Sequence, residues 1–291
     1  MKLKLKQFIY IIVIAVFILI TVFPIFWALV SSLRSDEEIF RYAMPFSWRT
    51  FVPDKLTFQS YINIFVEKHF GKVLFNTIFV GVATIVTGII VNAVAGFIFA
   101  KYTFRFKRLL FFLVVLSFMV PFEAVSIPLY KMITVLKWEN TYIALILPTV
   151  ANGLVIFLFK QFFEEIPNSL MEAATVEGAG MFTIFTKIVI PNSIPVMISA
   201  GLMIFMWQWE SFLWPLIVAR NENVRMVQVA LTDFQTQYSM LWSEMLAACL
   251  VSAAVPIIFL APLQKYYIQG IAGAGIKGLE YITFLNEANP Y

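Results

Sequence analysis

The strongest constraint on this chain comes from its long runs of uncharged, mostly apolar residues. Phe8–Val30 and Val73–Ala100 contain 23 and 28 residues without a single Asp, Glu, Lys or Arg. A helix needs about 20 apolar residues to cross the hydrocarbon core of a bilayer. Only 13% of the 291 residues are charged, whereas a soluble domain carries about 25%. The sequence therefore predicts an integral membrane protein.

We predict an all-α fold with six transmembrane helices. The first run follows a basic start but exceeds the apolar core of a signal peptide, which is about 7–15 residues, so we expect it to be retained. Glu123 and Glu210 interrupt later runs, and because a charge inside a membrane is costly we place both toward the outer ends of their spans. The predicted spans are Phe8–Val30, Val73–Ala100, Leu109–Tyr130, Thr141–Phe159, Pro195–Ala219 and Met245–Leu263.

The distribution of basic residues predicts the orientation in the membrane. Met1–Gln7 carries three lysines, and Lys101–Arg108 carries four basic residues in eight. Cytoplasmic segments near a span are enriched in Lys and Arg, so both segments, both termini and the loop 160–191 are expected on the cytoplasmic side. The long loop 33–72 is mixed in charge and has no obvious fold, except for a short amphipathic helix expected at residues 58–70 on the membrane surface.

The segment Pro167–Pro191 is the most informative stretch between spans. Its early residues read as a helical turn that Gly178 and Gly180 then break, because glycine tolerates the positive φ values that end helices. Met181–Ile190 reads as a second short helix with an apolar face, and we expect Pro191 to stop it. On these residues alone, an ordinary helical hairpin between two spans is an equally good interpretation.

The spacing within this segment resembles the Glu-Ala-Ala loop of ABC importer permeases. Residues at the family's positions are Glu172, Ala173, Ala174, Gly178, Ile188 and Pro191, with Ile190 in place of the usual leucine. The resemblance implies that the loop is a coupling helix docking into a cleft of an ATPase subunit. In that reading Glu172 makes a charged contact, Ala173, Ala174 and Ala179 give a close fit, and Gly178 makes the turn.

A second stretch, Trp207-Gln-Trp-Glu-Ser-Phe-Leu-Trp-Pro-Leu, resembles the fifth span of carbohydrate-type permeases of the maltose-system kind. Glu210 and Ser211 depart from the Asn-Asp pair usual there. The resemblance makes Trp207, Trp209, Glu210 and Trp214, together with Asn152 of the fourth span, candidate substrate-pathway residues. An aromatic belt at the membrane interface is an equally good interpretation of these tryptophans.

Several kinds of function are not indicated by the sequence. No Gly-x-x-x-x-Gly-Lys-Ser/Thr motif occurs, so we expect ATP and Mg²⁺ to be used by a separate subunit and no cofactor to be held in this chain. With one cysteine and one histidine, the sequence offers no Cys/His cluster for a structural metal site, and we expect none. No Ser/His/Asp set or catalytic carboxylate pair is recognised, and the net charge of +4 is spread over short loops and does not form a nucleic-acid patch.

The sequence thus predicts a permease subunit of an ATP-driven, binding-protein-dependent importer of a sugar or oligosaccharide. We expect three parts: residues 1–72 with the first helix and an external loop, a type-1 permease core over 73–264, and a cytoplasmic tail over 265–291. Expected partners are a second permease subunit, a cytoplasmic ATPase dimer, an extracytoplasmic sugar-binding protein and the lipid of a bacterial or archaeal cell membrane. The alternative is an ion-coupled secondary transporter of a small polar solute.

Overall fold

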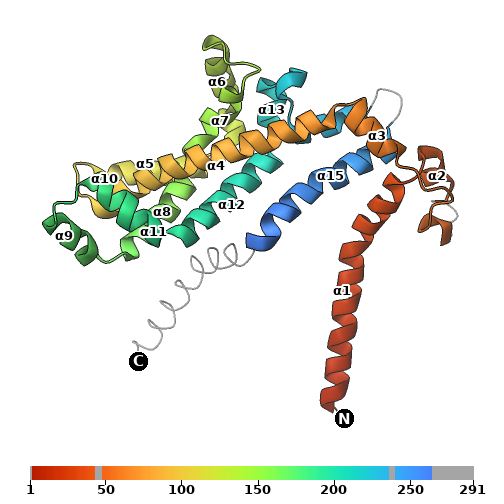
Figure 1. Cartoon of the computed structure of the whole chain (residues 1–291), viewed down its shortest axis with the longest axis horizontal. Coiled ribbons are helices and arrows are strands. Elements are labelled where there is room, and N and C mark those ends of the chain that lie inside the picture. The colour runs from red at the N-terminus through yellow and green to blue at the C-terminus, as the bar shows by residue number, and fades with distance from the viewer. Residues whose placement is uncertain (1, 43–47, 236–239, 264–291) are drawn as a thin grey trace. The chain divides into compact units, whose positions relative to one another are not determined.

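The computed structural model describes residues 2–42, 48–235 and 240–263, and every regular element named within them is helical (Figure 1). The predicted tail 265–291 lies outside the described residues. The elements are α1 Lys2–Ser32, α2 Asp36–Arg41, η1 Trp48–Thr50, α3 Gln59–Val66, α4 Phe70–Lys101, α5 Lys107–Met119, α6 Phe122–Val135, α7 Tyr142–Val150, α8 Gly153–Glu165, α9 Asn168–Val176, α10 Met181–Ile184, η2 Phe185–Val189, α11 Ile190–Asn192, α12 Ile194–Glu210, α13 Leu213–Val218, η3 Glu222–Val224, α14 Val227–Ala230, η4 Leu231–Phe234, α15 Trp242–Leu260 and η5 Ala261–Leu263.

The all-α membrane fold predicted from the sequence is confirmed. Three of the described helices are long and apolar enough to cross a membrane, and they are Lys6–Ser32, Phe70–Lys101 and Trp242–Leu263. Three further pairs of helices meet the same criterion when each bent pair is counted as one span. The count of six is therefore reached only by including spans that are broken.

The third and fourth predicted spans are each built from two helices separated by a break. The third breaks between α5 and α6 with a bend of 100°, and the fourth breaks between α7 and α8 with a bend of 46°. Pro121 accounts for the first break, because it has no N–H to donate and it favours extended backbone at the residue before it. Val120 is indeed extended, with φ −79° and ψ 120°.

The fifth span is also interrupted at both ends. The helix α12 ends at Glu210, Ser211 is extended, and the separate short helix α13 follows. Pro215 is tolerated because it falls in the first turn of α13, where no intrahelical N–H is needed. At the other end, α12 is bent by 81° relative to the helical segment Met181–Asn192.

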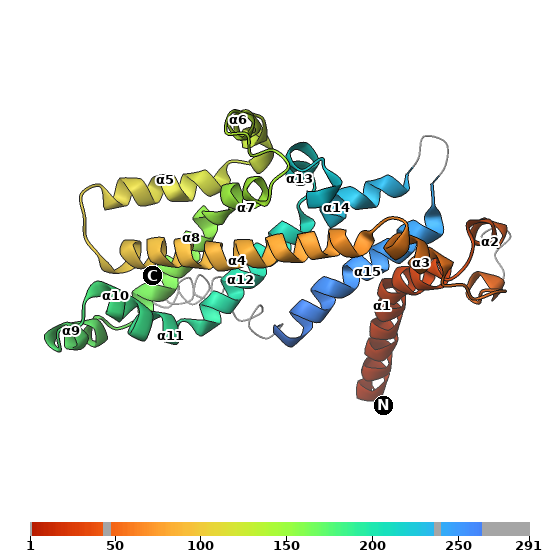
Figure 2. The same cartoon turned by 45° about the horizontal axis from the view of Figure 1, so that its top comes forward.

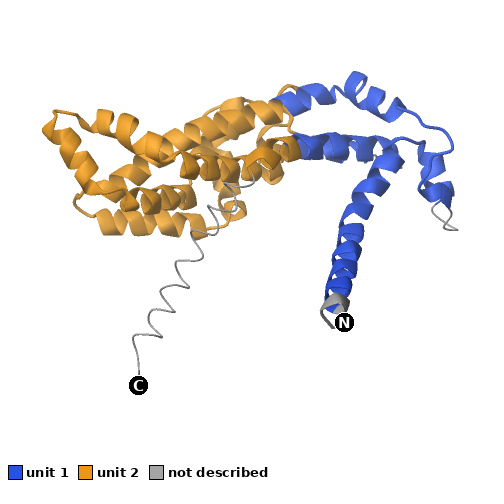
Figure 3. Ribbon diagram, turned by 60° about the horizontal axis from the view of Figure 1, so that its bottom comes forward, with its two compact units in different colours: residues 1–75, 227–255 blue, residues 76–226, 256–291 orange. Residues whose placement is uncertain are grey.

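The described chain divides into two compact units, coloured separately in Figure 3. Unit 1 comprises the described residues within 1–75 and 227–255, and unit 2 comprises the described residues within 76–226 and 256–291. Unit 1 has a buried apolar cluster in which Ile64 of α3, Phe70 of α4 and Phe234 of η4 pack together with Ala247 of α15. The amphipathic helix expected over residues 58–70 is present as the shorter α3.

The segment after α1 is folded around one buried arginine. Only 2% of the surface of Arg34 is exposed. Its Nε, Nη1 and Nη2 donate to the carbonyl oxygens of Val30, Arg49 and Thr50, at 3.3, 3.3 and 3.2 Å. Burial lowers the pKa of the Arg34 guanidinium, and the nearby carboxylates of Glu38 and Asp54 counter that shift.

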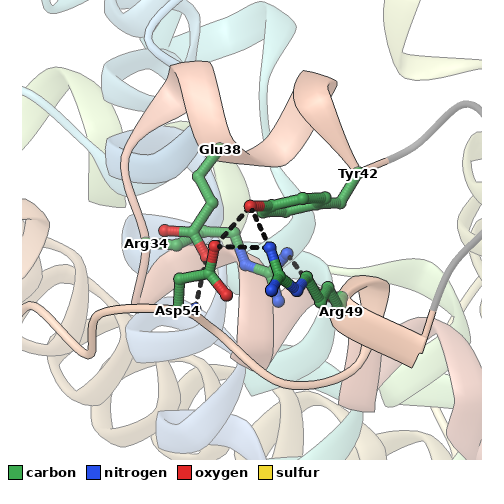
Figure 4. A network of polar contacts seen from close by, with 5 residues as sticks. All are labelled: Arg34, Glu38, Tyr42, Arg49 and Asp54. Carbon is green, nitrogen blue, oxygen red and sulfur yellow. Dashed lines mark hydrogen bonds and ion pairs between the residues drawn. The ribbon is translucent and has the colours of Figure 1, made fainter.

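Four further residues of the segment between α1 and α3 form a network of polar contacts with one another beside Arg34 (Figure 4). The Asp54 N–H donates to a Glu38 carboxylate oxygen at 2.7 Å, and the Tyr42 hydroxyl donates to the Asp54 carboxylate. Arg49 donates to the Tyr42 hydroxyl at 3.1 Å and pairs with Asp54 at 3.6 Å. A loop that the sequence left without a fold is therefore closed by its own polar residues.

Replacing Arg34 with Met should loosen residues 48–57, because three backbone carbonyls lose their donor. We expect a loss of about 2–3 kcal/mol in local stability, since hydrogen bonds to charged groups contribute about 1.5–3 kcal/mol each and these three are long. Amide hydrogen exchange of residues 48–57 in nanodiscs measures the change. Arg41→Met, an exposed arginine of α2, is the matched control, and equal exchange in the two variants would contradict the assignment.

Candidate functional site

Three of the helix breaks of unit 2 lie at one cavity of about 870 Å³. Its lining includes Pro121 between α5 and α6, Asn152 between α7 and α8, and Ser211 between α12 and α13. At membrane depth, non-helical backbone is tolerated only where it is buried in protein or faces a water-filled cavity. The convergence of three breaks on one cavity marks it as the candidate functional site.

Asn92 of α4 satisfies the backbone on both sides of the break between α7 and α8. Its side chain is fully buried. The Nδ2 atom donates to the Val150 carbonyl at 2.7 Å, and the Oδ1 atom accepts from the Asn152 N–H at 2.8 Å. Without Asn92 these two backbone groups would be unpaired in an apolar surrounding, so Asn92 holds the break open in a defined geometry.

Asn152 then starts the next helix. Its side-chain oxygen accepts from the N–H groups of Leu154 and Val155 at 2.9 and 3.2 Å, which makes it the N-cap of α8. Gly153, which follows, lies against α5 so closely that an added Cβ would be 2.3 Å from the Val114 carbonyl oxygen. Only glycine permits this approach, and α8 is therefore fixed against α5 directly beside the cavity.

The three predicted pathway tryptophans have different surroundings. Trp207 lines the cavity and is 42% exposed. Trp214 also lines it but is only 2% exposed, and its indole N–H donates to the Ala144 carbonyl at 2.9 Å. Trp209 is 5% exposed, does not line the cavity, and stacks on Phe205 with ring centroids 5.5 Å apart. Of the three, only Trp207 both lines the cavity and is exposed.

The charge of the cavity lining is negative. Exposed carboxylates of Glu123 and Glu210 both contribute to it. Among the described residues that line the cavity, none is Lys, Arg or His. The structure therefore gathers Asn152, Trp207, Glu210 and Trp214, four of the five predicted pathway residues, together with Glu123, around a space that carries no positive side chain.

The segment Pro167–Pro191 forms the predicted helix–glycine–helix elbow. Glu172, Ala173 and Ala174 lie in α9, which ends at Val176. Gly178 has a φ of +84°. Its N–H donates to the Thr175 carbonyl at 3.0 Å, and the Ala179 N–H donates to the Ala174 carbonyl at 2.9 Å. This paired arrangement is the Schellman motif, and it requires the left-handed conformation that glycine adopts at no steric cost.

The elbow has an exposed side and a side that packs on unit 2. Glu172, Ala173 and Gly178 are exposed, whereas Ala174 and Ala179 are half-buried against the apolar cluster of unit 2. Figures 1 and 2 place α9 and α10 at the end of unit 2 away from α6 and α13. The elbow and the cavity therefore lie toward opposite ends of the same unit.

The start of the elbow is anchored to α4. The Lys101 ammonium donates to the Ile166 carbonyl at 2.5 Å and to the Asn168 side-chain oxygen at 2.9 Å. Beside it, Phe97 of α4 contacts Phe163 of α8, with ring centroids 6.3 Å apart. These contacts join the start of α9 to α4, and α4 to α8.

The prediction that Pro191 stops the second short helix is wrong. Pro191 lies inside α11, and the helical segment continues to Asn192. A proline ring clashes with the carbonyl four residues earlier. The π-helical turn Phe185–Val189 lies directly upstream and widens the helix at that point, so the ring of Pro191 can be accommodated without ending the helix. The chain bends at Ser193 instead, where φ is −112° and ψ is 12°.

Replacing Asn92 with Leu should destabilise the folded chain by about 2–4 kcal/mol, because each buried backbone group left unpaired costs about 1–3 kcal/mol. The midpoint of thermal unfolding in detergent measures the loss. Asn192→Leu is the matched control, since Asn192 is exposed and its side chain donates to Ile188 in its own turn. A midpoint for Asn92→Leu equal to that of the control would show that the break does not depend on Asn92.

Comparison with known proteins adds an independent observation. Residues 92–272 match the family described as binding-protein-dependent transport system inner membrane component. The arabinooligosaccharide transport system permease protein AraQ of Halalkalibacterium halodurans is 29% identical over 89% of this chain and 92% of its own length. The sn-glycerol-3-phosphate transport system permease protein UgpE of Rhizobium meliloti is 30% identical over 87% of this chain and 92% of its own length.

Two further relatives extend the comparison. A probable ABC transporter permease protein of Pyrococcus horikoshii is 32% identical over 87% of this chain and 92% of its own length. Among solved structures, a chain of a bacterial ABC transporter involved in the import of the acidic polysaccharide alginate superposes with a TM-score of 0.79. It is 21% identical, and the match covers 91% of this chain and 96% of that one. The structural likeness confirms the fold.

Proposed function

This chain belongs to the family of binding-protein-dependent transport system inner membrane components, and we propose that it forms half of the translocation pathway of an ATP-driven importer of a sugar or oligosaccharide. The observation that carries the proposal is the cavity at the breaks α5–α6, α7–α8 and α12–α13, lined by Asn152, Trp207 and Glu210. A sugar needs hydrogen-bonding groups and an aromatic face, and the cavity provides both. Relatives named for arabinooligosaccharide and lactose transport support a carbohydrate as the transported solute.

In this proposal a second permease subunit completes the pathway. A sugar-binding protein delivers the solute from outside, and a cytoplasmic ATPase dimer supplies the energy with its own ATP and Mg²⁺. The chain is a multi-pass membrane protein, and we place it in the cell membrane of a bacterium or archaeon with both termini cytoplasmic. The orientation rests on the basic segments 1–7 and 101–108, which the positive-inside rule assigns to the cytoplasm.

The elbow is the proposed contact with the ATPase. The exposed Glu172 and Ala173 of α9 are available to a groove on a partner, and Lys101 ties the start of α9 to α4. Closure of the ATPase dimer would move α9, and α8, joined to α9 through Ile166 and Pro167, would carry that movement to the break at Asn152. The helix α8 runs from the elbow to the cavity without a break.

One observation bears on the alternative of an ion-coupled transporter. Glu123 and Glu210 line the cavity, and carboxylates on a transport path are what proton or sodium coupling uses. The energy source separates the two functions. The proposed importer takes up solute with ATP and no ion gradient, whereas the alternative needs the gradient and not ATP.

Replacing Gly178 with Val should lower ATP-dependent uptake about 5- to 150-fold, because a β-branched residue in the left-handed conformation costs about 1–3 kcal/mol and about 1.4 kcal/mol corresponds to tenfold. Uptake is measured in proteoliposomes that contain the whole transporter, with ATP inside and no ion gradient. Membrane insertion should be unaffected, since an added Cβ at Gly178 meets no atom within 4 Å.

Gly178→Asn is the matched control at the same position, because asparagine adopts the left-handed conformation more readily than other residues with a side chain. We expect it to retain most of the uptake. Unimpaired uptake in Gly178→Val would contradict the coupling role of the elbow. Uptake that follows an ion gradient and ignores ATP would replace the proposed function by the alternative.

A further inference from the structure

One hydroxyl group at the cavity is buried without a partner. Thr84 of α4 lines the cavity and is 1% exposed. Within the part of the chain that the structure describes, its Oγ1 atom has no hydrogen-bond partner. Two other hydroxyls of the cavity lining do have partners, since Ser117 donates to the Val114 carbonyl at 2.7 Å and Thr149 donates to the Ile146 carbonyl at 2.9 Å. Since native proteins rarely bury an unpaired hydroxyl, Thr84 points to a partner from outside the chain.

A second buried polar side chain comes from the neighbouring helix. Gln208 of α12 lines the same cavity and is 4% exposed. The two helices touch at glycines, because a Cβ added to Gly81 of α4 would lie 3.7 Å from Phe205, and one added to Gly201 of α12 would lie 3.5 Å from Ile85. A glutamine amide offers both donors and an acceptor, so it and a hydroxyl can each hydrogen-bond to the O–H groups of a sugar.

The charge of the lining limits the solute. An anion in this cavity would meet the carboxylates of Glu123 and Glu210, and none of the described lining residues is a Lys, Arg or His that could pair with it. Anion sites in proteins are built from arginine, lysine or backbone N–H groups. A neutral solute avoids this repulsion, and its ring can stack on the exposed face of Trp207, as apolar sugar faces do on aromatic rings.

We infer that Thr84 and Gln208 form a hydrogen-bonding subsite for an uncharged, hydroxyl-rich solute, and that the carboxylates of Glu123 and Glu210, which this chain contributes to the pathway, disfavour anionic sugars and sugar phosphates. The inference rests on the proposed function for its solute class, and it deepens that function by naming the residues and the charge of what they bind. It separates this chain from relatives named for the import of sn-glycerol 3-phosphate and of the acidic polysaccharide alginate.

The test measures binding without the binding protein and without ATP. The assembled transporter is purified in detergent, and its unfolding midpoint is recorded with lactose or arabinotriose, and separately with sn-glycerol 3-phosphate or alginate disaccharide. A ligand that binds only the folded state raises the midpoint. We expect both neutral sugars to raise it and both anions to leave it unchanged.

Four variants test whether the sugar-induced shift of the unfolding midpoint depends on Thr84 and Gln208. Thr84→Val and Gln208→Leu should abolish the sugar-induced shift and lower ATP-dependent uptake about tenfold, which corresponds to about one net hydrogen bond. Thr84→Ser keeps the hydroxyl and should keep both the shift and the uptake. Thr87→Val is the matched control on the same helix, because Thr87 is exposed and its hydroxyl donates to the Ala83 carbonyl.

The unliganded midpoint separates a binding role from a structural one. If the Thr84 hydroxyl serves a ligand, Thr84→Val removes an unpaired polar group, so its midpoint without sugar should equal or exceed that of the wild type. A lower midpoint would assign Thr84 a structural role and overturn the subsite. A full sugar-induced shift in Thr84→Val and Gln208→Leu, or no shift in the wild type, would also overturn it.

The remaining outcomes separate this inference from the proposed function. A shift with sn-glycerol 3-phosphate or alginate disaccharide as large as that with lactose would overturn the exclusion of anions. Sugar-induced stabilisation that disappears in Thr84→Val, combined with no ATP-dependent uptake by the wild type, would support the subsite while overturning the proposed function.

Discussion

The break between α7 and α8 depends on the side chain of Asn92, and the arrangement of the site depends on that break. A membrane offers no water to an unpaired peptide group, so a span can be interrupted only if another part of the protein replaces the lost hydrogen bonds. Asn92 donates to Val150 on one side of the interruption and accepts from Asn152 on the other. The cost of non-helical backbone is thereby offset within the fold.

The two ends of unit 2 are built differently. At one end, helices that stop and restart leave polar groups facing a cavity, among them Asn152, Trp207 and Glu210. At the other end, the elbow is held by Lys101 and by the aromatic contacts of Phe97. The helix α8 connects the two, since it begins at the cap made by Asn152 and ends just before α9. This connection is the physical basis for expecting movement at the elbow to alter the cavity.

Hydrophobic runs and turn residues predicted much of this structure. Six apolar segments and the glycine elbow could be predicted from the sequence, because a span in lipid requires a long run of apolar residues and a positive φ favours glycine. The positions of the breaks could not be read in the same way. Pro121 marks one break, but Pro148 lies inside α7, and the break after α7 depends on Asn92, which is distant in sequence and gives no local signal.

The same limit applies to the candidate site. The tryptophan-rich stretch predicted that Trp207, Trp209 and Trp214 share one role. In the folded chain Trp209 and Trp214 are buried, and Trp207 is the exposed tryptophan of the cavity lining. Thr84 and Gln208 are single polar residues in apolar helices, so only the packed structure reveals that they line the same space. Arg34, which folds the loop after α1, likewise reads in the sequence as one more charge in a mixed segment.

The most direct measurement of the central claim is to purify this chain from its native membranes in mild detergent and identify the proteins that accompany it by mass spectrometry. The account predicts an ATPase subunit, a second six-span permease and a solute-binding protein in the same complex. A chain that purifies alone, or only with copies of itself, would contradict the claim that it is half of an ATP-driven importer.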